Sequence, residues 1–510
     1  MRKAIFSLLG FVTLSAAASS PDYTKGVFIV NEDWYGHNNS TLNHLDPDNP
    51  DGDYWTYRVI QHENEGMELG ATNQFGAIFQ GRFYLIAKQA KDPGADITGG
   101  RITIADAATM KIIKQIELID PTGAQCDGRG FVGVDAQKGY VSSSNGVWIL
   151  NLQQAEITGR VKGTENPFAG GDGDKPVTNP SGALYHGQSG SMTATAGHVF
   201  AAHQSKGLLV IDPSQDAVTH TIPIATTLHL AGAWNPDAEQ TAKIEAGETT
   251  IDEIGPGIGS VVAARDGSLW VSVAEDISGS GVSYPALIHV DPNDLSTEVI
   301  ELPGDMAGPH SSWYAWTPDA FCSSAVTDCL YWKGGATRWF GGSKLFKFNT
   351  STRKSTLLVD TMDKTQGEWG IYGCSMRVHP STDEIYVSLY KDFINETYLL
   401  RRYSSEGSII KDYPMISNYW FPSLPVFPES AGNSSVVNIT HVGTGRIESI
   451  GKNRLKITDM QGAQGAIYDV SGRCVERFTI AENEVIFSPN LPAGIYILRI
   501  GNRSVRCIFT

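Results

Sequence analysis

Positive charge is scarce in this sequence. Lysine and arginine together number 39, against 55 aspartates and glutamates, and the formal net charge is −16 over 510 residues. Phosphate backbones and anionic membrane surfaces both need clustered basic side chains, because electrostatic attraction carries most of that kind of binding. The composition therefore argues against nucleic acid as a partner.

Long apolar runs are missing after the first twenty residues, since no later segment approaches the ~20 apolar residues that a membrane-spanning helix needs. The start of the chain differs. A basic pair at residues 2–3 precedes an apolar stretch at 4–14 and small residues at Ala16 and Ala18. This layout is typical of a cleavable secretory signal, which we place at residues 1–18. We expect a secreted or cell-surface protein. Because there is no cysteine near the cleavage site, a lipid anchor on the mature N-terminus is not indicated.

Motifs of metal binding and hydrolysis are also missing. No CxxC, GxSxG or HExxH motif occurs, and no cluster of His and Cys has the spacing of a zinc site. Asp172 and Asp174 could touch calcium, but their Gly-rich loop lacks a full ligand set. Glu275 and Asp276 are adjacent, so on a strand they would point apart. The sequence predicts no metal site, identifies no cofactor and gives catalysis little support.

Cysteine is sparse, with six residues in the chain. In an exported protein they can form disulfides. Cys126 and Cys374 are left open as free or paired. A disulfide between Cys322 and Cys329 would close a short loop, while Cys474 and Cys507 both fall in the last domain.

A repeated strand pattern is what the sequence does contain. In residues 208–224, apolar residues lead into Asp212 and Pro213, a polar turn follows, and apolar and polar residues then alternate up to Ile222. An apolar run into Asx-Pro followed by alternation predicts two strands joined by a turn. Six further versions lie at residues 42–53, 102–116, 147–161, 287–300, 345–359 and 399–413.

A second recurring unit, with a Gly-rich or aromatic start and two short strands, precedes six of the seven hairpins. Four-stranded units repeating at roughly 50 to 70 residues are typical of a β-propeller. The first hairpin lacks an innermost strand, and residues 418–427 supply one, so the two ends would share a blade and remove the open sheet edges. The sequence predicts a seven-bladed propeller over residues 26–430. Copies of the second unit lie at residues 75–87, 131–141, 190–201, 258–271, 313–316 and 374–387.

Two further segments interrupt or follow this repeat. Residues 236–247 contain helix-forming residues after a proline, which predicts a short helix on a long excursion between blades. After Pro428 the composition becomes that of a linker, and short alternating strands around Gly turns follow. We predict an all-β chain in which a small β-sandwich at residues 437–510 follows the propeller.

The C-terminal sequence resembles the sorting domain of substrates of the Bacteroidetes type IX secretion system. The resemblance rests on AIYDVSGRCV at residues 466–475 and LPAGIYILRI at residues 491–500. It implies export across the outer membrane, with the type IX secretion machinery as a partner and this domain as the address.

The propeller resembles the seven-bladed surface propellers of gut Bacteroidetes, a group that includes the cobalamin-capturing partner of an outer-membrane transporter. The segments that carry the resemblance are residues 28–32, 312–316, 330–333 and 418–422. It implies a cell-surface protein that binds a corrinoid, with an outer-membrane transporter as the implied partner.

Function in a propeller usually lies on the face where the loops around the channel gather. Aromatic and hydrogen-bonding side chains there suit a large, partly apolar ligand such as a corrinoid or a glycan. We expect about half of such residues to be packing residues instead, and we assign Trp148, Trp316 and Trp332 to packing. The predicted ligand-binding residues are Trp34, Tyr35, Phe75, Arg129, His186, His310, Trp313, Arg338, Tyr372 and Trp420.

Three classes of function remain open. The leading one is a non-enzymatic binder of a large nutrient, with a corrinoid as the specific hypothesis. The second is a propeller lyase or hydrolase acting on a glycan or lactone, for which His186, His203 and His310 would have to meet over the channel and hold a metal. The third is a protein-interaction scaffold, which needs a broad apolar patch.

Overall fold

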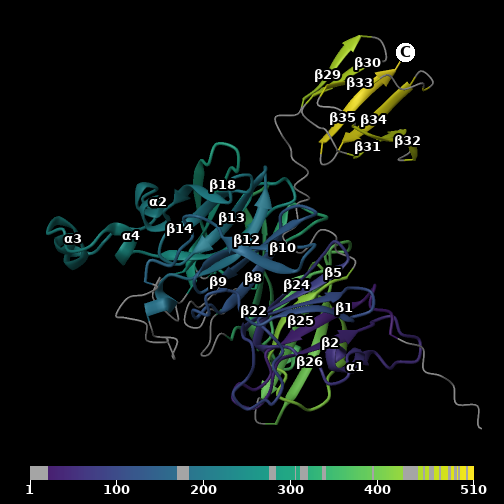
Figure 1. Cartoon of the computed structure of the whole chain (residues 1–510). Helices are drawn as coiled ribbons and strands as arrows, with labels where there is room; N and C mark the ends of the chain where they lie inside the picture. The colour runs from purple at the N-terminus through teal and green to yellow at the C-terminus, as the bar shows by residue number, and fades with distance from the viewer. Residues whose placement is uncertain are drawn as a thin grey trace, which may run out of the picture.

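Eight four-stranded antiparallel sheets and one three-stranded sheet make up the computed structural model within the residues it describes (Figure 1). Residues 1–18, where we predict the signal peptide, lie outside them. The described residues are 21–168, 183–274, 283–304, 306–309, 320–335, 341–392 and 395–428, followed by 446–451, 454–458, 464–469, 473–480, 484–487, 491, 494–500 and 503–509.

The seven four-stranded sheets formed by strands β1 to β28 are the blades of a propeller, because their innermost strands follow one another around a closed ring. The innermost strands contact one another in the cyclic order β28, β4, β8, β12, β16, β20, β24 and back to β28. These strands are β28 (Pro422–Val426), β4 (Ala71–Phe79), β8 (Gly128–Gly133), β12 (Ser189–Thr195), β16 (Gly257–Ala263), β20 (Phe321–Ser323) and β24 (Gly370–Val378).

Each blade then runs outward through three more strands, with successive strands antiparallel. The second strands are β1 (Val27–Asn31), β5 (Arg82–Gln89), β9 (Lys138–Ser143), β13 (His198–His203), β17 (Leu269–Ala274), β21 (Cys329–Gly334) and β25 (Ile385–Asp392). The third are β2 (Thr41–Leu45), β6 (Ile102–Asp106), β10 (Gly146–Asn151), β14 (Gly207–Asp212), β18 (Ser283–Val290), β22 (Lys344–Asn349) and β26 (Thr397–Tyr403). The outermost are β3 (Trp55–Thr56), β7 (Ile112–Ile116), β11 (Glu156–Arg160), β15 (Ala217–Ile222), β19 (Thr297–Glu301), β23 (Lys354–Asp360) and β27 (Ile409–Pro414).

Blade 1 combines the two ends of the propeller, as the sequence predicted. Strand β28 pairs with β1 in the order β28-β1-β2-β3, with Phe28 opposite Val426 and Ile29 opposite Pro425. We number the other sheets as blades 2 to 7 in chain order. The predicted seven-bladed ring, closed by its own last strand, is confirmed.

The hairpins between third and outermost strands share one turn chemistry. At the end of β14, Asp212 Oδ1 accepts a hydrogen bond of 2.8 Å from the backbone N–H of Ser214, and Asp216 adopts a positive φ of 48°. The turn after β18 repeats this, since Asp291 Oδ1 accepts from Asn293 N–H at 2.8 Å and Leu295 has a φ of 62°. An Asx side chain that caps its own turn therefore recurs in the sequence as the hairpin signal.

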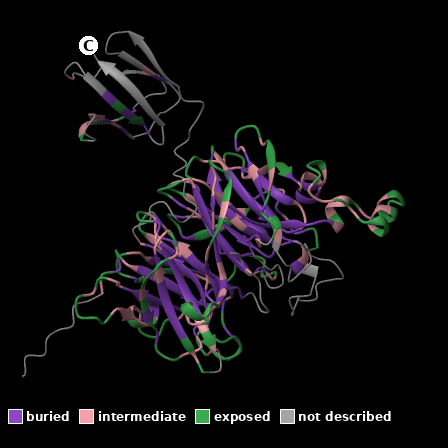
Figure 2. Cartoon of the chain, turned by 180° about the vertical axis from the view of Figure 1, so that it is seen from behind, coloured by how far each residue is buried: buried purple, intermediate pink, exposed green. Residues whose placement is uncertain are grey.

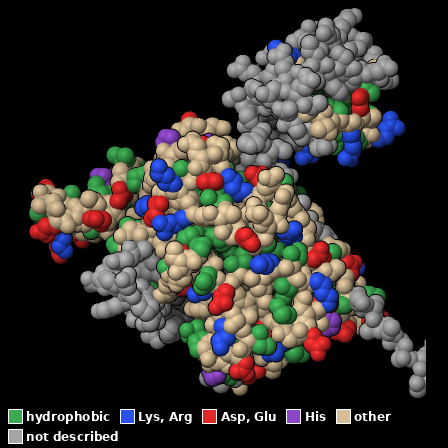
Figure 3. Space-filling model, in the orientation of Figure 1, with side chains coloured by type: hydrophobic (Ala, Val, Ile, Leu, Met, Phe, Trp, Pro, Cys, Tyr) green, Lys and Arg blue, Asp and Glu red, His purple; other side chains and the backbone are tan. Residues whose placement is uncertain are grey.

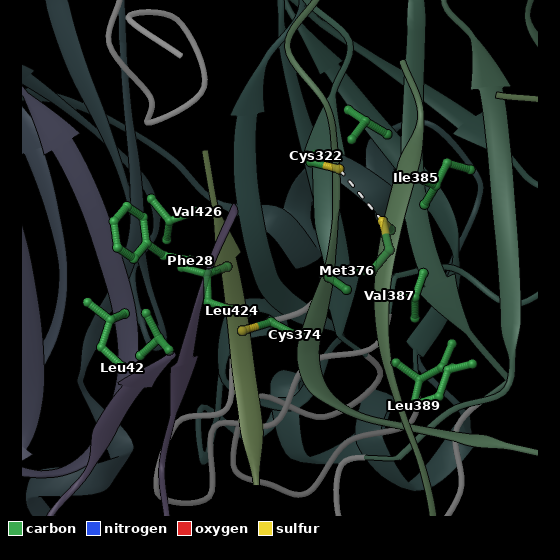
Figure 4. Packing of buried hydrophobic residues seen from close by; sticks show 14 of the residues in the cluster. Phe28, Leu42, Cys322, Cys374, Met376, Ile385, Val387, Leu389, Leu424 and Val426 are labelled. Carbon is green, nitrogen blue, oxygen red and sulfur yellow. Dashed lines mark hydrogen bonds between the residues drawn. The ribbon is translucent and has the colours of Figure 1, made fainter. Parts of the chain in front are cut away.

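The core lies between neighbouring blades, and the innermost and second strands are the most buried (Figure 2). Figure 4 shows Phe28 and Leu424 of blade 1 in the same cluster as Met376 and Val387 of blade 7 and Cys322 of blade 6. The outermost strands are mostly exposed or half-buried, as in β7 and β19, and β11 alternates between the two. Apolar contact between blades is what holds the ring closed.

Long helices are absent from the described part of the propeller, and no helix there is long and apolar enough to cross a membrane. The predicted helix near residues 236–247 is present as α3 (Ala238–Glu245), capped by Asp237, whose side chain accepts from Gln240 N–H at 2.9 Å. It lies on an excursion that projects from the ring and carries several acidic side chains (Figures 1 and 3). The other short helices are α1 (Val59–Glu63), η1 (Ala183–His186), α2 (Ile224–Leu230), α4 (Ile251–Ile254) and η2 (Lys364–Gln366).

The candidate disulfide between Cys322 and Cys329 is not formed, because both residues are thiols. Strand register explains the difference: Cys322 lies opposite Tyr331, and its sulfur contacts Met376 Sδ of the next blade at 4.0 Å (Figure 4). Cys474, in the C-terminal sandwich, is also a thiol.

The C-terminal strands form a small β-sandwich, as predicted. One sheet has the order β29-β30-β33 and the other β32-β31-β34-β35, and Ile457, Ile467 and Leu498 from the two sheets share one buried cluster. The strands are β29 (Arg446–Gly451), β30 (Arg454–Thr458), β31 (Gln464–Asp469), β32 (Cys474–Thr479), β33 (Glu484–Phe487), β34 (Gly494–Ile500) and β35 (Arg503–Phe509).

Candidate functional site

The face that carries the site is set by strand direction. Because strands alternate in each blade, the connections from second to third strands and those entering the innermost strands emerge on the same side of the ring. We call this side the loop face. In blades 1 and 2 it is built from residues 32–40, residues 57–70 with α1, and residues 90–101.

A cleft of about 250 Å³ opens on the loop face between blades 1 and 2. All three connections contribute to it, so its shape depends on how the two blades meet. Its wall is mainly polar, and the side chains that matter below are His37, Asn39, Arg58, Gln61, Glu68 and Asp96.

Asn39 fixes the three connections to one another. Its Nδ2 donates to Glu68 Oε2 at 2.6 Å and to the carbonyl of Ile97 at 2.7 Å, while its Oδ1 accepts from the backbone N–H of Asp92 at 2.8 Å. Asp92 in turn accepts from Gly36 N–H at 2.8 Å. The side chain of Asn39 is buried, so these bonds preorganise the cleft.

Two groups on the cleft wall are left for a ligand. Within the described residues, the guanidinium of Arg58 makes no hydrogen bond or ion pair, although its backbone N–H donates to Asn43 Oδ1 at 3.0 Å. Gln61 Oε1 is buried and has no hydrogen-bond partner there either. The guanidinium lies 6.0 Å from the centroid of the Trp420 ring, so its hydrogen-bond donors remain available. Arg58 and Gln61 therefore supply donors and an acceptor for a ligand.

A row of aromatic rings leads from the cleft rim toward the channel. Trp34, 40% exposed, lies 4.2 Å from Tyr419 between ring centroids, Tyr419 lies 6.3 Å from Phe421, and Phe421 lies 5.6 Å from Tyr372. The hydroxyl of Tyr372 then donates to Glu32 Oε2 at 3.4 Å. The row is therefore exposed at one end and meets a buried carboxylate at the other.

Glu32 belongs to a group of polar residues, buried except for the half-buried Tyr372, at the loop-face end of the innermost strands, which we call the channel-mouth cluster. It comprises Glu32, Gln74, Lys88, Asp127, Arg129, Tyr185, Gln188 and Tyr372. Gln74 Nε2 donates to Glu32 Oε1 at 2.7 Å. Burial raises the pKa of Glu32, and the nearby charge of Lys88 opposes that rise.

Arg129 anchors the other half of the channel-mouth cluster. Its Nε and Nη2 donate to Gln188 Oε1 at 2.9 and 2.6 Å, and Nη2 lies 3.8 Å from Asp127 Oδ2. The hydroxyl of Tyr185 donates to the same Asp127 oxygen at 2.5 Å, and burial raises the pKa of Tyr185. Lys88, 6% exposed, completes the cluster; burial and the charge of Arg129 lower its pKa to about 7.

The structure brings four of the predicted ligand-binding residues onto this part of the molecule. Trp34 and Tyr35 are exposed on the loop between β1 and β2, at 40% and 57%. Arg129 and Tyr372 lie deeper, in the channel-mouth cluster. His186 is half-buried at the end of η1, 6.3 Å from the ring of Phe168.

Two predicted residues have a packing role. Trp420, interpreted from the sequence as an exposed contact, is 1% exposed, stacks on Tyr57 at 5.5 Å and donates from Nε1 to the carbonyl of Ile416 at 2.9 Å. Phe75 packs against apolar clusters on both sides of blade 2. His310, Trp313 and Arg338 lie outside the described residues, as do Glu275 and Asp276.

Sequence reasoning missed Glu32, Asn39 and Arg58. An acidic residue directly after the apolar strand β1 was the available signal for Glu32, but nothing local distinguishes Asn39 from its neighbours. His203 is buried, and burial lowers its pKa to about 3, so it is a neutral side chain at the end of β13. Among the described residues, no group of three His, Cys, Asp or Glu side chains could hold a metal ion.

Comparisons with known proteins place the propeller in a family. Residues 25–428 match the family model described as "Domain of unknown function (DUF5074)". Among curated proteins, none matches the sequence.

Solved structures resemble the chain only distantly. The extracellular domain of a protein described as a one component system from B. thetaiotaomicron is 14% identical, with a TM-score of 0.44, and the match covers 95% of this chain and 57% of that one. PorZ, a surface component of the type-IX secretion system of Porphyromonas gingivalis, is 11% identical, with a TM-score of 0.41, and covers 92% and 62%. This chain thus spans less than two thirds of either relative, and its fold is assigned from its own sheets and contacts.

Proposed function

We propose, for a chain that belongs to the DUF5074 family over residues 25–428, that it is an exported, non-catalytic binding protein whose ligand lies on the loop face. The family description names no activity, so the proposal rests on this chain's own side chains.

One observation carries the proposal: the loop at residues 32–40 carries an exposed aromatic surface and also lines the polar cleft. Trp34 lies at the head of the aromatic row, and His37, 4.0 Å from its ring, lines the cleft. Flat apolar faces beside convergent donors and acceptors suit a large ligand that both stacks and forms hydrogen bonds.

A corrinoid is the leading ligand class. Its broad ring offers a face to Trp34 and Tyr35, and its amide-bearing edge offers partners to Arg58 and Gln61. A cleft of about 250 Å³ holds only part of such a molecule, so the rest would lie across the loop face. A glycan is the second candidate, because an exposed tryptophan beside acidic and amide groups also suits a sugar ring.

The proposed location and partners rest on the sequence resemblances. The strands at residues 464–469 and 494–500 carry the text that resembles a type IX sorting domain, and both belong to the same sheet of the sandwich. We therefore include the type IX secretion machinery as the export partner and an outer-membrane transporter as the partner that takes up the ligand.

Calorimetric titration with cyanocobalamin, haem and neutral oligosaccharides tests the binding function. We expect one of these classes to bind, and Trp34→Ala to weaken it about 30-fold, which corresponds to about 2 kcal/mol for an anchor residue. Ile113→Ala is the matched control, because Ile113 is 47% exposed on the outermost strand β7. Binding that survives Trp34→Ala, Tyr35→Ala and Arg58→Ala unchanged would contradict the proposed site.

A further inference from the structure

Lys88 lies one residue before the loop-face end of β5 and is 6% exposed. Its ammonium group makes no hydrogen bond or ion pair with any described residue. A lysine that is this buried loses much of its hydration, and without an acceptor for its ammonium it gains little in exchange.

Lys333 is a buried lysine at the corresponding position of another blade, and its ammonium has an acceptor. It lies one residue before the end of β21, the second strand of blade 6, and is 1% exposed. Its ammonium donates to the backbone carbonyl of Gly373 on the neighbouring blade. Lys88 occupies the corresponding place in blade 2 without such an acceptor.

The charged groups around Lys88 come from three other blades. Its charge interacts with those of Arg129 and Asp127 of blade 3, Glu32 of blade 1 and the thiol of Cys374 of blade 7. Both carboxylates have other partners already, since Glu32 accepts from Gln74 and Tyr372, and Asp127 accepts from Tyr185 and lies beside Arg129. The acceptor that Lys88 lacks is therefore not supplied by its acidic neighbours.

We propose that the channel-mouth cluster binds a carboxylate group, with Lys88 as the residue that pairs with it. A carboxylate supplies an acceptor and a single negative charge beside Lys88 and Arg129, whose positive charges interact across blades 2 and 3. A dianion such as phosphate fits less well, because the carboxyl groups of Glu32 and Asp127 also lie close enough to interact with Lys88. The raised pKa of Glu32 supports the choice, since a protonated Glu32 leaves the cluster with an excess positive charge.

The carboxylate can come from two sources: a free small carboxylate, or an acidic group on a larger ligand that also covers the loop face. The site does not depend on which ligand class occupies the cleft. Titrations of the full chain at pH 6 with acetate, with acetamide and with paired acidic and neutral oligosaccharides distinguish the sources.

We expect acetate or the acidic oligosaccharide to bind, and acetamide and the neutral oligosaccharide to bind at least tenfold more weakly. Lys88→Met should weaken carboxylate binding at least tenfold, Lys88→Arg should restore most of it, and Lys333→Met should leave it unchanged. If acetate binds, a free small carboxylate is sufficient to occupy the site. If only the acidic oligosaccharide binds, the carboxylate belongs to a larger ligand. Equal binding by the wild type and Lys88→Met, or binding by neither carboxylate, overturns the proposal.

A second measurement on the wild type covers the case in which Lys88→Met does not fold. The Lys88 amine, followed by NMR of labelled lysine, should titrate near pH 7, and saturating carboxylate should move that midpoint upward, because a bound anion stabilises the ammonium. Carboxylate binding should accordingly weaken as the pH rises through 7. A midpoint that saturating acetate and the acidic oligosaccharide both leave unchanged overturns the proposal.

Discussion

The Ser423 hydroxyl donates a hydrogen bond of 3.0 Å to the backbone carbonyl of Val30, 393 residues earlier in the chain. The same hydroxyl lies 2.9 Å from the carbonyl of Asn73. One buried side chain on the last propeller strand therefore contacts both the first blade and the second, at the point where the ring closes.

Ser423→Ala should lower the free energy of unfolding by about 1 to 2 kcal/mol, because two buried carbonyls lose their shared donor. Urea denaturation monitored by tryptophan fluorescence measures the change. Ser351→Ala is the control, since the Ser351 hydroxyl makes an exposed bond of 2.9 Å to Asp328 and its loss should stay within about 0.5 kcal/mol. If the two substitutions lower the free energy of unfolding equally, the hydrogen bonds of Ser423 contribute no more to stability than an exposed one does.

Trp420→Ala should destabilise the propeller by about 3 to 5 kcal/mol, as expected when a fully buried aromatic side chain leaves a cavity. Trp34→Ala removes a ring of the same type that is 40% exposed, so its effect on the melting temperature should be much smaller. Differential scanning calorimetry of the two variants makes the comparison. A larger loss of stability in Trp34→Ala would contradict the assignment of Trp420 to packing.

Asp33→Asn should change how stability depends on pH. Asp33 is buried and accepts from Thr41 Oγ1 at 2.6 Å, and burial raises its pKa from 3.8 to about 7. The folded protein therefore keeps a proton that the unfolded chain releases, so this group stabilises fully below pH 3.8 and its contribution disappears as the pH rises to 7. Each pKa unit corresponds to about 1.4 kcal/mol.

Urea denaturation of the wild type and Asp33→Asn at intervals from pH 4 to pH 8 measures this contribution. The difference between the two curves matters, because other groups such as His203 titrate in both proteins. The wild type should lose stability relative to the variant between pH 4 and pH 7. Parallel curves over that window would mean that Asp33 is ionised in the folded state.

Gly94→Ala should distort the cleft. A Cβ at Gly94 would lie 2.5 Å from the carbonyl oxygen of Gly36, so the connections of blades 1 and 2 would have to move apart. We expect weaker ligand binding and a loss of about 1 to 3 kcal/mol in stability, as for overpacking elsewhere. Gly304→Ala is the matched control, because its Cβ would meet no atom within 4 Å. If Gly94→Ala leaves the ligand affinity unchanged, the ligand does not bind in the cleft.

Local chemistry explains which parts of the fold the sequence could predict. The hairpin of β14 and β15 is visible in residues 208–224 because an Asx cap and strict alternation both act over a few residues. Strand β28 was predictable for a similar reason, as an isolated strand left without a blade. Helices α2 and α4 were missed, since they are too short to show helical periodicity.

The site depends on distances that no local pattern encodes. Glu32, Lys88 and Arg129 come from three blades, so only the closed ring brings their charges together. Trp34 and Trp420 both occur in polar loops rich in aromatic residues, yet one is exposed and the other is covered by Tyr57. Burial of this kind is decided by the packing between the first and last blades.

The shared blade also determines the order in which the strands of the propeller can pair during folding. A chain that emerges from its N-terminus can pair β1 with β2 early, but the other edge of β1 stays open until residues 422–426 have arrived. Six more blades form in that interval, each with its own local hairpins, while the first one waits with unpaired backbone groups and an uncovered apolar face. The slowest and most aggregation-prone moment in the life of this protein is therefore expected just before its last propeller strand docks, and any factor that shields the edge of β1 should raise the yield of folded protein.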